Sequence, residues 1–103
     1  MADEAALEQD RLDRWLWHAR FFRTRSLAAK VVAGGKVRVN GQRTAKPART
    51  VGPGDVLTFP QGKLIRVVRI QAIAKRRGPA SEAALLFGEI SASSGPKSGP
   101  ALD

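Results

Sequence analysis

The stretch GGKVRVNGQR, residues 34–43, decides the fold that this sequence predicts. Asn40-Gly41 stands between two strand-like runs, and this dipeptide is a strong signal for a tight β-hairpin turn. Two valines alternate with Lys36 and Arg38, so one face of the first strand is apolar and the other is cationic. The turn itself needs no cations, and the stretch holds no acidic residue. The hairpin is therefore predicted to meet a negatively charged partner.

A helix is predicted over RLDRWLWHARFF, residues 11–22, because four of its apolar side chains recur on one face at helical spacing. Asp10 is the predicted N-cap, and Asp13 suits the positive end of the helix dipole. Trp17 and Phe21 fall outside the apolar face. We expect a short C-terminal helix to cover this aromatic pair, although stacking on nucleobases is the alternative.

A second helix is predicted over SLAAKVV, residues 26–32, after a cap at Thr24 or Ser26. Its entry, FFRTRS, places Arg23 and Arg25 beside the free N–H groups of a helix N-terminus, where a phosphate binds favourably. Two adjacent glycines end the helix, as glycine commonly does.

Leu27 and Val31 are predicted to form the inner face of this second helix, with Ala28 beside them.

The rest of the chain predicts a small antiparallel sheet. VLTF and KLIRVVRIQAIA, residues 56–59 and 63–74, read as strands separated by a PQG turn, with a bulge expected near Val67 and Val68. A short helix capped by Ser81 follows. The fold class is thus α+β, with two N-terminal helices packed on a small antiparallel sheet and a short C-terminal helix. The predicted division is a flexible acidic lead-in (1–9), a binding domain (10–76), a helical extension (77–90) and a disordered Gly/Ser/Pro-rich tail (91–103).

Composition argues against catalysis. The chain of 103 residues suits one domain, and it has no cysteine and a single histidine. Disulfides and cysteine-ligated zinc are therefore excluded, and we expect no metal, cofactor or enzymatic activity. His18 is expected to be exposed or to stack, not to act as a base. No apolar run approaches the ~20 residues that span a bilayer, so no membrane contact is predicted. The acidic N-terminus is not a secretory signal and nothing points to an oxidising compartment, so we expect an intracellular, cytoplasmic protein. We also expect a monomer.

The charge distribution predicts a polyanionic partner. The formal net charge is +9, but residues 11–77 hold 17 of the 18 Lys and Arg residues and only two acidic ones, a net charge of +15. Such a density on a small fold is the footprint of nucleic-acid binding. An anionic membrane is the competing partner, but no basic amphipathic helix or lipid anchor is evident.

The motifs together resemble a known family. RLD at 11–13, TRS at 24–26, GGKVRVNG at 34–41 and the GD before a strand resemble the S4 RNA-binding domain. The continuation RRGPASEAALLF is similar to that of the bacterial fifteen-kilodalton heat-shock proteins, a ribosome-associated group within that family. The resemblance implies an S4-like fold of the alpha-L type.

The resemblance also implies a partner and contacts. It implies binding to ribosomal RNA of the large subunit, in rescue or recycling of stalled ribosomes under heat stress. The alternatives are tRNA, an accessory role in trans with a tRNA- or rRNA-modifying enzyme, and non-specific DNA binding. The motif match implies RNA contacts at Arg11, Arg23, Thr24, Arg25, Lys30, Lys36, Arg38 and Asn40. Arg14 and Ser26 complete the predicted set.

Overall fold

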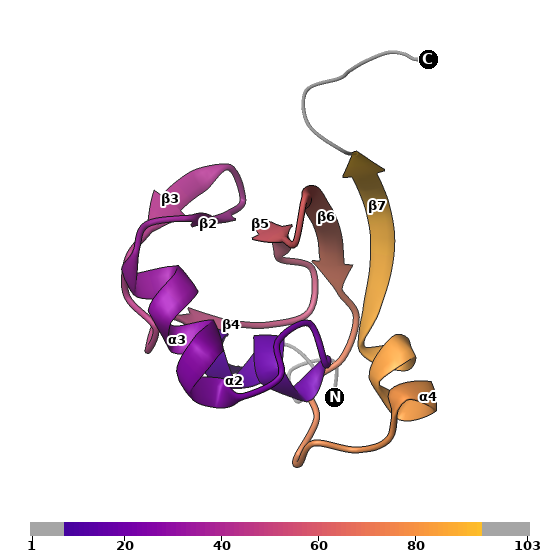
Figure 1. Cartoon of the computed structure of the whole chain (residues 1–103). Helices are drawn as coiled ribbons and strands as arrows, with labels where there is room; N and C mark the ends of the chain where they lie inside the picture. Colours follow the sequence, from indigo (N-terminus) through magenta and orange to yellow (C-terminus); the bar gives the residue numbers. More distant parts are fainter. Residues whose placement is uncertain (1–7, 94–103) are drawn as a thin grey trace.

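The fold is built on a five-stranded antiparallel sheet with the strand order β3-β2-β5-β6-β7, as the computed structural model of residues 8–93 shows (Figure 1). A separate two-stranded ladder joins β1 to β4. The strands are β1 (Asp10–Arg11), β2 (Val37–Val39), β3 (Gln42–Thr44), β4 (Thr50–Val51), β5 (Val56–Gln61), β6 (Leu64–Ile70) and β7 (Phe87–Ser93). The helices are α2 (Leu12–His18), α3 (Arg25–Ala33) and α4 (Ala80–Ala83), and α4 continues into a 3-10 turn, η1 (Ala84–Leu86). The α+β class predicted from the sequence is confirmed.

The start of α2 is capped by a distant loop, not by Asp10 as predicted. The N-cap is Arg11, which makes no side-chain cap. Instead the Leu12 N–H donates to the Arg49 carbonyl at 2.8 Å, and the Asp13 N–H donates to the Pro47 carbonyl at 3.1 Å. These bonds satisfy donors that every helix start leaves free. Asp10 is released to pair as a strand residue and to bind side chains of α2.

The first helix ends at His18, four residues before its predicted end at residue 22. Arg20 adopts a φ of 67°, and its N–H donates to the Trp17 carbonyl at 3.0 Å. The Phe21 N–H then donates to the Leu16 carbonyl at 3.1 Å. This pair of bonds is a Schellman motif, in which a left-handed residue closes the helix end. Arginine occupies a position that glycine usually takes, so the sequence gives no signal that the helix ends here.

Helix α3 and the following hairpin largely confirm the predictions. The Thr24 Oγ1 accepts a hydrogen bond from the Leu27 N–H at 3.0 Å, so Thr24 is the cap. The predicted inner face is wrong by one position: Ala28 and Val32 are buried, whereas 44% of Leu27 is exposed. The predicted turn is present, because Asn40 and Gly41 both have positive φ, at 53° and 85°.

The chain beyond the hairpin contains one strand that the sequence analysis missed. Residues 87–93, assigned partly to a helical extension and partly to a disordered tail, form β7 and pair with β6. The predicted bulge is confirmed by a register shift between Val67 and Val68. The turn predicted at PQG, residues 60–62, is in fact at residues 62–63, since β5 continues through Gln61 and β6 begins at Leu64. Ser81 caps nothing, because the N-cap of α4 is Pro79. The remaining predicted tail, 94–103, and most of the lead-in, 1–7, lie outside the described residues.

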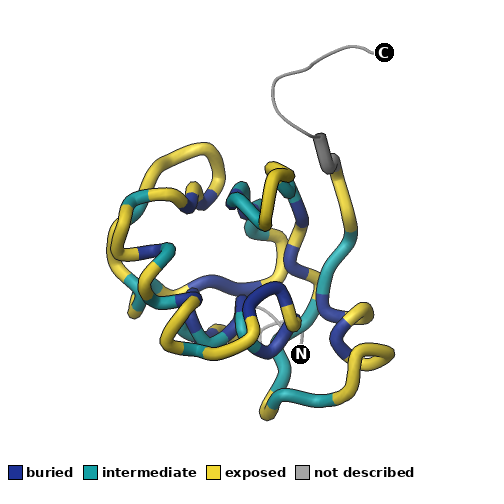
Figure 2. Tube along the Cα trace, viewed as in Figure 1, coloured by how far each residue is buried: buried dark blue, intermediate teal, exposed yellow. Residues whose placement is uncertain are grey.

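The buried residues lie where the two N-terminal helices meet the sheet (Figure 2). Aromatic rings pack together within this core. The Phe21 ring lies 4.8 Å from that of Phe59 and 4.6 Å from that of Phe87, measured between centroids. Phe21 is therefore buried against the sheet, which excludes it as a stacking platform for bases, while α4 and η1 line a small hollow beside it. Trp17 is half-buried, and the Arg77 guanidinium covers its ring at 5.6 Å from the centroid.

Phe21→Ala is expected to lower the free energy of unfolding by about 3–5 kcal/mol, because it removes a ring packed on three aromatic neighbours. Urea denaturation followed by circular dichroism measures the change. Leu85→Ala is the control, since 72% of Leu85 is exposed, and its effect should stay within about 0.5 kcal/mol. Equal stability of the two variants would contradict this description of the core.

Candidate nucleic-acid interface

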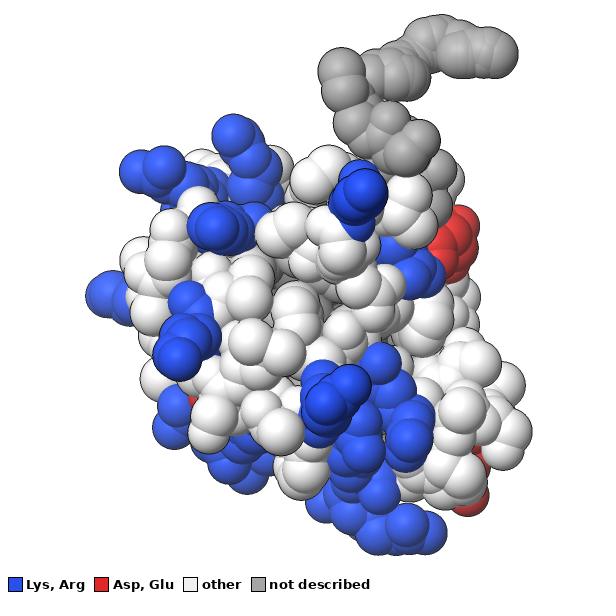
Figure 3. Space-filling model, in the orientation of Figure 1, with Lys and Arg blue, Asp and Glu red and all other residues white. Residues whose placement is uncertain are grey.

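Lys and Arg side chains project from α3 and the hairpin on the face shown in Figure 3, and a second cationic cluster lies at its lower edge, near α2 and the loop that leads to α4. The acidic side chains visible in this view gather chiefly on the side of α4 and β7. Two acidic residues near the helices, Asp10 and Asp13, are buried, and Asp55 is half-buried in the turn before β5. The positive charges of α3 and the hairpin thus face solvent with little acidic surface beside them.

The buried acids neutralise three of the predicted contact residues. Asp13 binds the Arg11 Nε at 3.1 Å and lies 3.6 Å from the Arg25 Nε. Asp10 binds the Arg14 Nε at 2.5 Å. A buried carboxylate is costly unless a cation pairs with it, so these arginines are first of all structural counterions. Each remains roughly two-fifths exposed, so the outer side of each guanidinium still reaches solvent.

The entry of α3 holds polar and cationic groups that are not neutralised in this way. Arg23, Thr24, Ser26 and Lys30 are all exposed, and within the described part of the chain neither Arg23 nor Lys30 forms an ion pair. The Thr24 Oγ1 accepts the capping hydrogen bond from the Leu27 N–H. The structure therefore brings Arg23, just before α3, and Lys30, on α3, to one hollow as two available positive charges.

The hairpin adds a second group of cations on the outward face of the sheet. Lys36 lies just before β2 and is exposed. Arg38 and Arg43 are directly opposite each other in the β2–β3 register, and both are exposed. Like charges in directly opposed positions destabilise a sheet unless an anion lies between them. Arg43 was absent from the predicted set, although the two-residue turn already fixes its pairing with Arg38.

The side chain of Asn40, a predicted contact, makes hydrogen bonds within the fold. Its Nδ2 donates to the Asp55 carboxylate at 3.0 Å, and its Oδ1 accepts from the Val56 N–H at 2.9 Å. The side chain therefore ties the hairpin turn to the start of β5. In the same way, the basic run at 75–77 is partly structural, since the Arg77 Nε donates to the Trp17 carbonyl at 3.1 Å.

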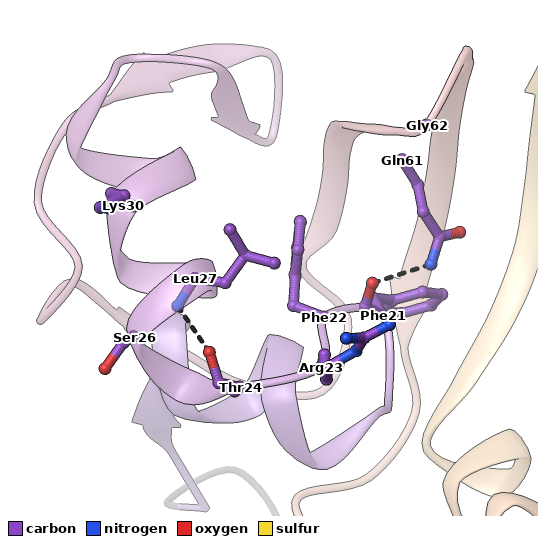
Figure 4. A pocket seen from close by; sticks show the side chains of 9 residues that line it. All are labelled: Phe21, Phe22, Arg23, Thr24, Ser26, Leu27, Lys30, Gln61 and Gly62. Carbon is purple, nitrogen blue, oxygen red and sulfur yellow. Dashed lines mark hydrogen bonds between the residues drawn. The ribbon is translucent and has the colours of Figure 1, made fainter.

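A groove of about 630 Å³ opens between the N-terminal turn of α3 and the turn after β5 (Figure 4). Phe22 and Leu27 point toward each other across it, and Arg23 and Lys30 also line it. The Gln61 Nε2 donates to the Phe21 carbonyl at 2.8 Å and holds the opposite wall in place. Sequence reasoning missed this groove, because it placed Leu27 in the core.

His18 is buried, contrary to the expectation of an exposed side chain. Its Nδ1 lies 3.6 Å from the Asp10 Oδ2, and neither atom has a hydrogen-bond partner. Burial lowers the pKa of His18 below its ordinary 6.5, and the Asp10 carboxylate opposes that shift only in part. Trp17 covers the imidazole, with 5.2 Å between ring centroids. The histidine is a packed structural group whose Nδ1 faces the Asp10 carboxylate.

The described residues contain no helix long and apolar enough to cross a membrane. Nor does this part of the chain group three or more His, Cys, Asp or Glu side chains as metal ligands would be grouped.

Comparison with known proteins identifies the family. Residues 10–57 match the S4 domain family. Heat shock protein 15 of Escherichia coli K12 is 50% identical over 93 residues, which cover 90% of this chain and 68% of that protein. The chain is a member of the heat shock protein 15 family. The resemblance to S4 proteins predicted from the sequence is thereby confirmed.

Two further relatives extend the comparison. A solved structure of heat shock protein 15 from Vibrio cholerae, described as trimeric, has a TM-score of 0.76 and 48% identity, and the match covers 82% of this chain and 84% of that chain. The RQC P-site tRNA stabilizing factor of Bacillus subtilis is 35% identical over 63 residues, which cover 61% of this chain and 72% of that protein. The fold of this heat shock protein 15 family member is thus similar to that of a solved structure in the same family.

Asn40→Gly is expected to lower the free energy of unfolding by about 1–2 kcal/mol, because it keeps the positive φ and removes two hydrogen bonds. Asn40→Ala should cost about 1 kcal/mol more through backbone strain. Urea denaturation measures both, while RNA affinity of the folded variants should remain within twofold. Unchanged stability with weakened RNA binding would instead make Asn40 a contact residue.

Stability is expected to fall as the pH drops below about 6.5. The pKa of His18 is lowered in the folded chain, so the unfolded chain takes up a proton that the folded chain does not. Above pH 6.5 both states are neutral at this position, and the contribution is fully present. Melting temperatures at pH 7.5 and 5.5 should converge more closely in His18→Gln than in the parent chain. An identical pH dependence in both proteins would contradict the assignment.

Proposed function

We propose that this protein binds ribosomal RNA through its phosphate backbone, using α3 and the β2–β3 hairpin. The observation that carries the proposal is the run of exposed cations without acidic partners in the described structure: Arg23, Lys30, Lys36, Arg38 and Arg43. Lys and Arg neutralise phosphates and release condensed counterions, which gives affinity without requiring base contacts. Arg11, Arg14 and Arg25 add their outer edges to this surface, while Thr24 and Ser26 border it.

The site within the cell is the large ribosomal subunit, in the rescue or recycling of stalled ribosomes during heat stress in the cytoplasm. Two observations support this finer proposal. The chain belongs to a family named for heat shock, and a more distant relative is named for stabilising P-site tRNA. The function proposed is binding without catalysis, because the described site offers cations and hydroxyls but no positioned base or nucleophile.

Sedimentation of the tagged protein on sucrose gradients tests the proposal. Co-migration with free large subunits, lost on Arg23→Ala/Lys30→Ala substitution, is the expected result. Absence from all ribosomal fractions would favour tRNA, or an enzyme partner recovered by co-purification. Competition between ribosomal RNA, tRNA and duplex DNA in filter binding then separates an RNA partner from a non-specific DNA partner.

Arg23→Ala/Lys30→Ala is expected to weaken binding to a ribosomal RNA fragment about tenfold or more and to reduce the salt dependence of log Kd by about one unit per lost contact. Filter binding at several salt concentrations measures both quantities. Lys75→Ala/Arg76→Ala removes the same charge from the loop beside α4 and serves as the matched control. Equal losses in the two variants would show that net charge alone, and not this surface, determines affinity.

A further inference from the structure

The groove beside α3 combines two properties that phosphate binding alone does not require. Its lining includes the apolar side chains Phe22 and Leu27, and it also includes the exposed cations Arg23 and Lys30. Its volume of about 630 Å³ lies within the range of small-ligand sites. A flat backbone contact would be served by the cations without a hollow between them.

Leu27 has no role in the fold that explains its place. It is 44% exposed at the N-terminal turn of α3, whereas the neighbouring Ala28 and Val32 supply the buried face of the helix. The cap fixes its position, because the Leu27 N–H donates to the Thr24 Oγ1. Leu27 lines the same hollow as Phe22, next to the cations Arg23 and Lys30, and this combination suits a partner that is both apolar and anionic.

The opposite wall of the groove is already formed. Both polar ends of Gln61 are engaged, its Nε2 with the Phe21 carbonyl and its Oε1 with the Arg66 Nη1 at 2.5 Å. Arg66 is held in turn by a bidentate ion pair with Glu89 of β7 and lies over the Phe21 ring. The wall thus rests on three neighbouring segments, and no rearrangement is needed to open the space.

We propose that this groove receives one unstacked nucleotide of the bound RNA, with its base against Phe22 and Leu27 and its flanking phosphates on Arg23 and Lys30. A nucleotide matches both parts of the lining, because it joins an aromatic face to a negatively charged backbone. Sequence-specific recognition of RNA generally uses bases in loops and bulges, since paired bases are not accessible in the deep major groove. Base pairing is absent at a bulge, so the base is free to enter.

An apolar side chain from a protein partner is the competing occupant, and the charges argue against it. Within the described structure, Arg23 and Lys30 have no ion-pair partner, and an aliphatic side chain would leave both without an anion. A nucleotide satisfies the apolar floor and the cations at once. The proposal rests on the RNA binding proposed above and adds the kind of RNA feature that is recognised.

The test compares two RNA hairpins that differ only in a single bulged 5-iodouridine. The parent protein is expected to bind the bulged hairpin roughly fivefold or more tightly than the fully paired one, in keeping with the worth of one base–apolar contact. Leu27→Gln should abolish this preference while leaving affinity for the paired hairpin unchanged. Ultraviolet irradiation should cross-link the 5-iodouridine to the peptide that contains Phe22 and Leu27.

Leu85→Gln is the matched control, because it makes the same chemical change at an exposed leucine of η1, and it should keep the preference. Thermal melting verifies that both variants remain folded. Equal binding of the two hairpins by the parent protein, or an equal loss for both in Leu27→Gln, overturns the nucleotide groove but leaves phosphate binding intact.

Two other outcomes are separable from these. If Leu27→Gln weakens binding to large subunits but not to either hairpin, the occupant is a protein side chain and the nucleotide proposal is overturned. If the parent protein binds neither hairpin nor ribosomal RNA, the proposed function itself fails, and the groove proposal fails with it.

Discussion

The early end of α2 is the constraint on which the rest of the structure depends. Arg20 turns the backbone into the left-handed region, and this change of direction carries Phe21 into the aromatic core instead of along another helical turn. Phe22 follows at the edge of the groove, and the next residues lead directly into the cap of α3. A helix continued to residue 22 would have removed both the central ring of the core and the approach that orients α3.

The same region shows how acidic residues sort the cations of a basic protein. Asp10 and Asp13 are buried, and each must be neutralised to remain so. They take Arg14 and Arg11, with Arg25 near enough to add to the field around Asp13. Net charge therefore overstates the binding surface, because part of it balances charges inside the protein. The unpaired cations of the proposed binding surface lie beside and along α3 and on the hairpin.

Local signals in the sequence predicted the elements that local chemistry controls. Asn40-Gly41 specified the hairpin, and Thr24 specified the start of α3, because each acts through bonds to near neighbours. The end of α3 was also predictable, since Gly35 takes the left-handed position that glycine favours. Arg20 closes α2 with the same motif, but an arginine carries no such signal, and its conformation is imposed by the packing of Phe21.

Long-range contacts account for what sequence reasoning missed. Carbonyls of Pro47 and Arg49, far along the chain, cap α2, so no capping side chain marks its start. The sequence of β7 was assigned to the end of a helix and the beginning of a polar tail, because its composition has no clear strand signal. Its strand conformation is stabilised by pairing with β6. The predicted contact set stays a prediction, and which of its arginines pair with buried acids depended on burial that one sequence does not reveal.

The division of labour on the surface follows from the range of each interaction. In the proposed binding mode, phosphate contacts act over a Debye length and would hold the protein against any RNA of suitable shape, so they would give affinity with little selectivity. The proposed groove would act only on a nucleotide in direct contact with it. One of its walls is held by hydrogen bonds among Gln61, Arg66 and Glu89, which lie on β5, β6 and β7. Because this wall is already ordered, binding in the groove would not carry the free-energy cost of ordering a loop. Since Leu27 is 44% exposed, a change there disturbs the core far less than a change in the aromatic centre.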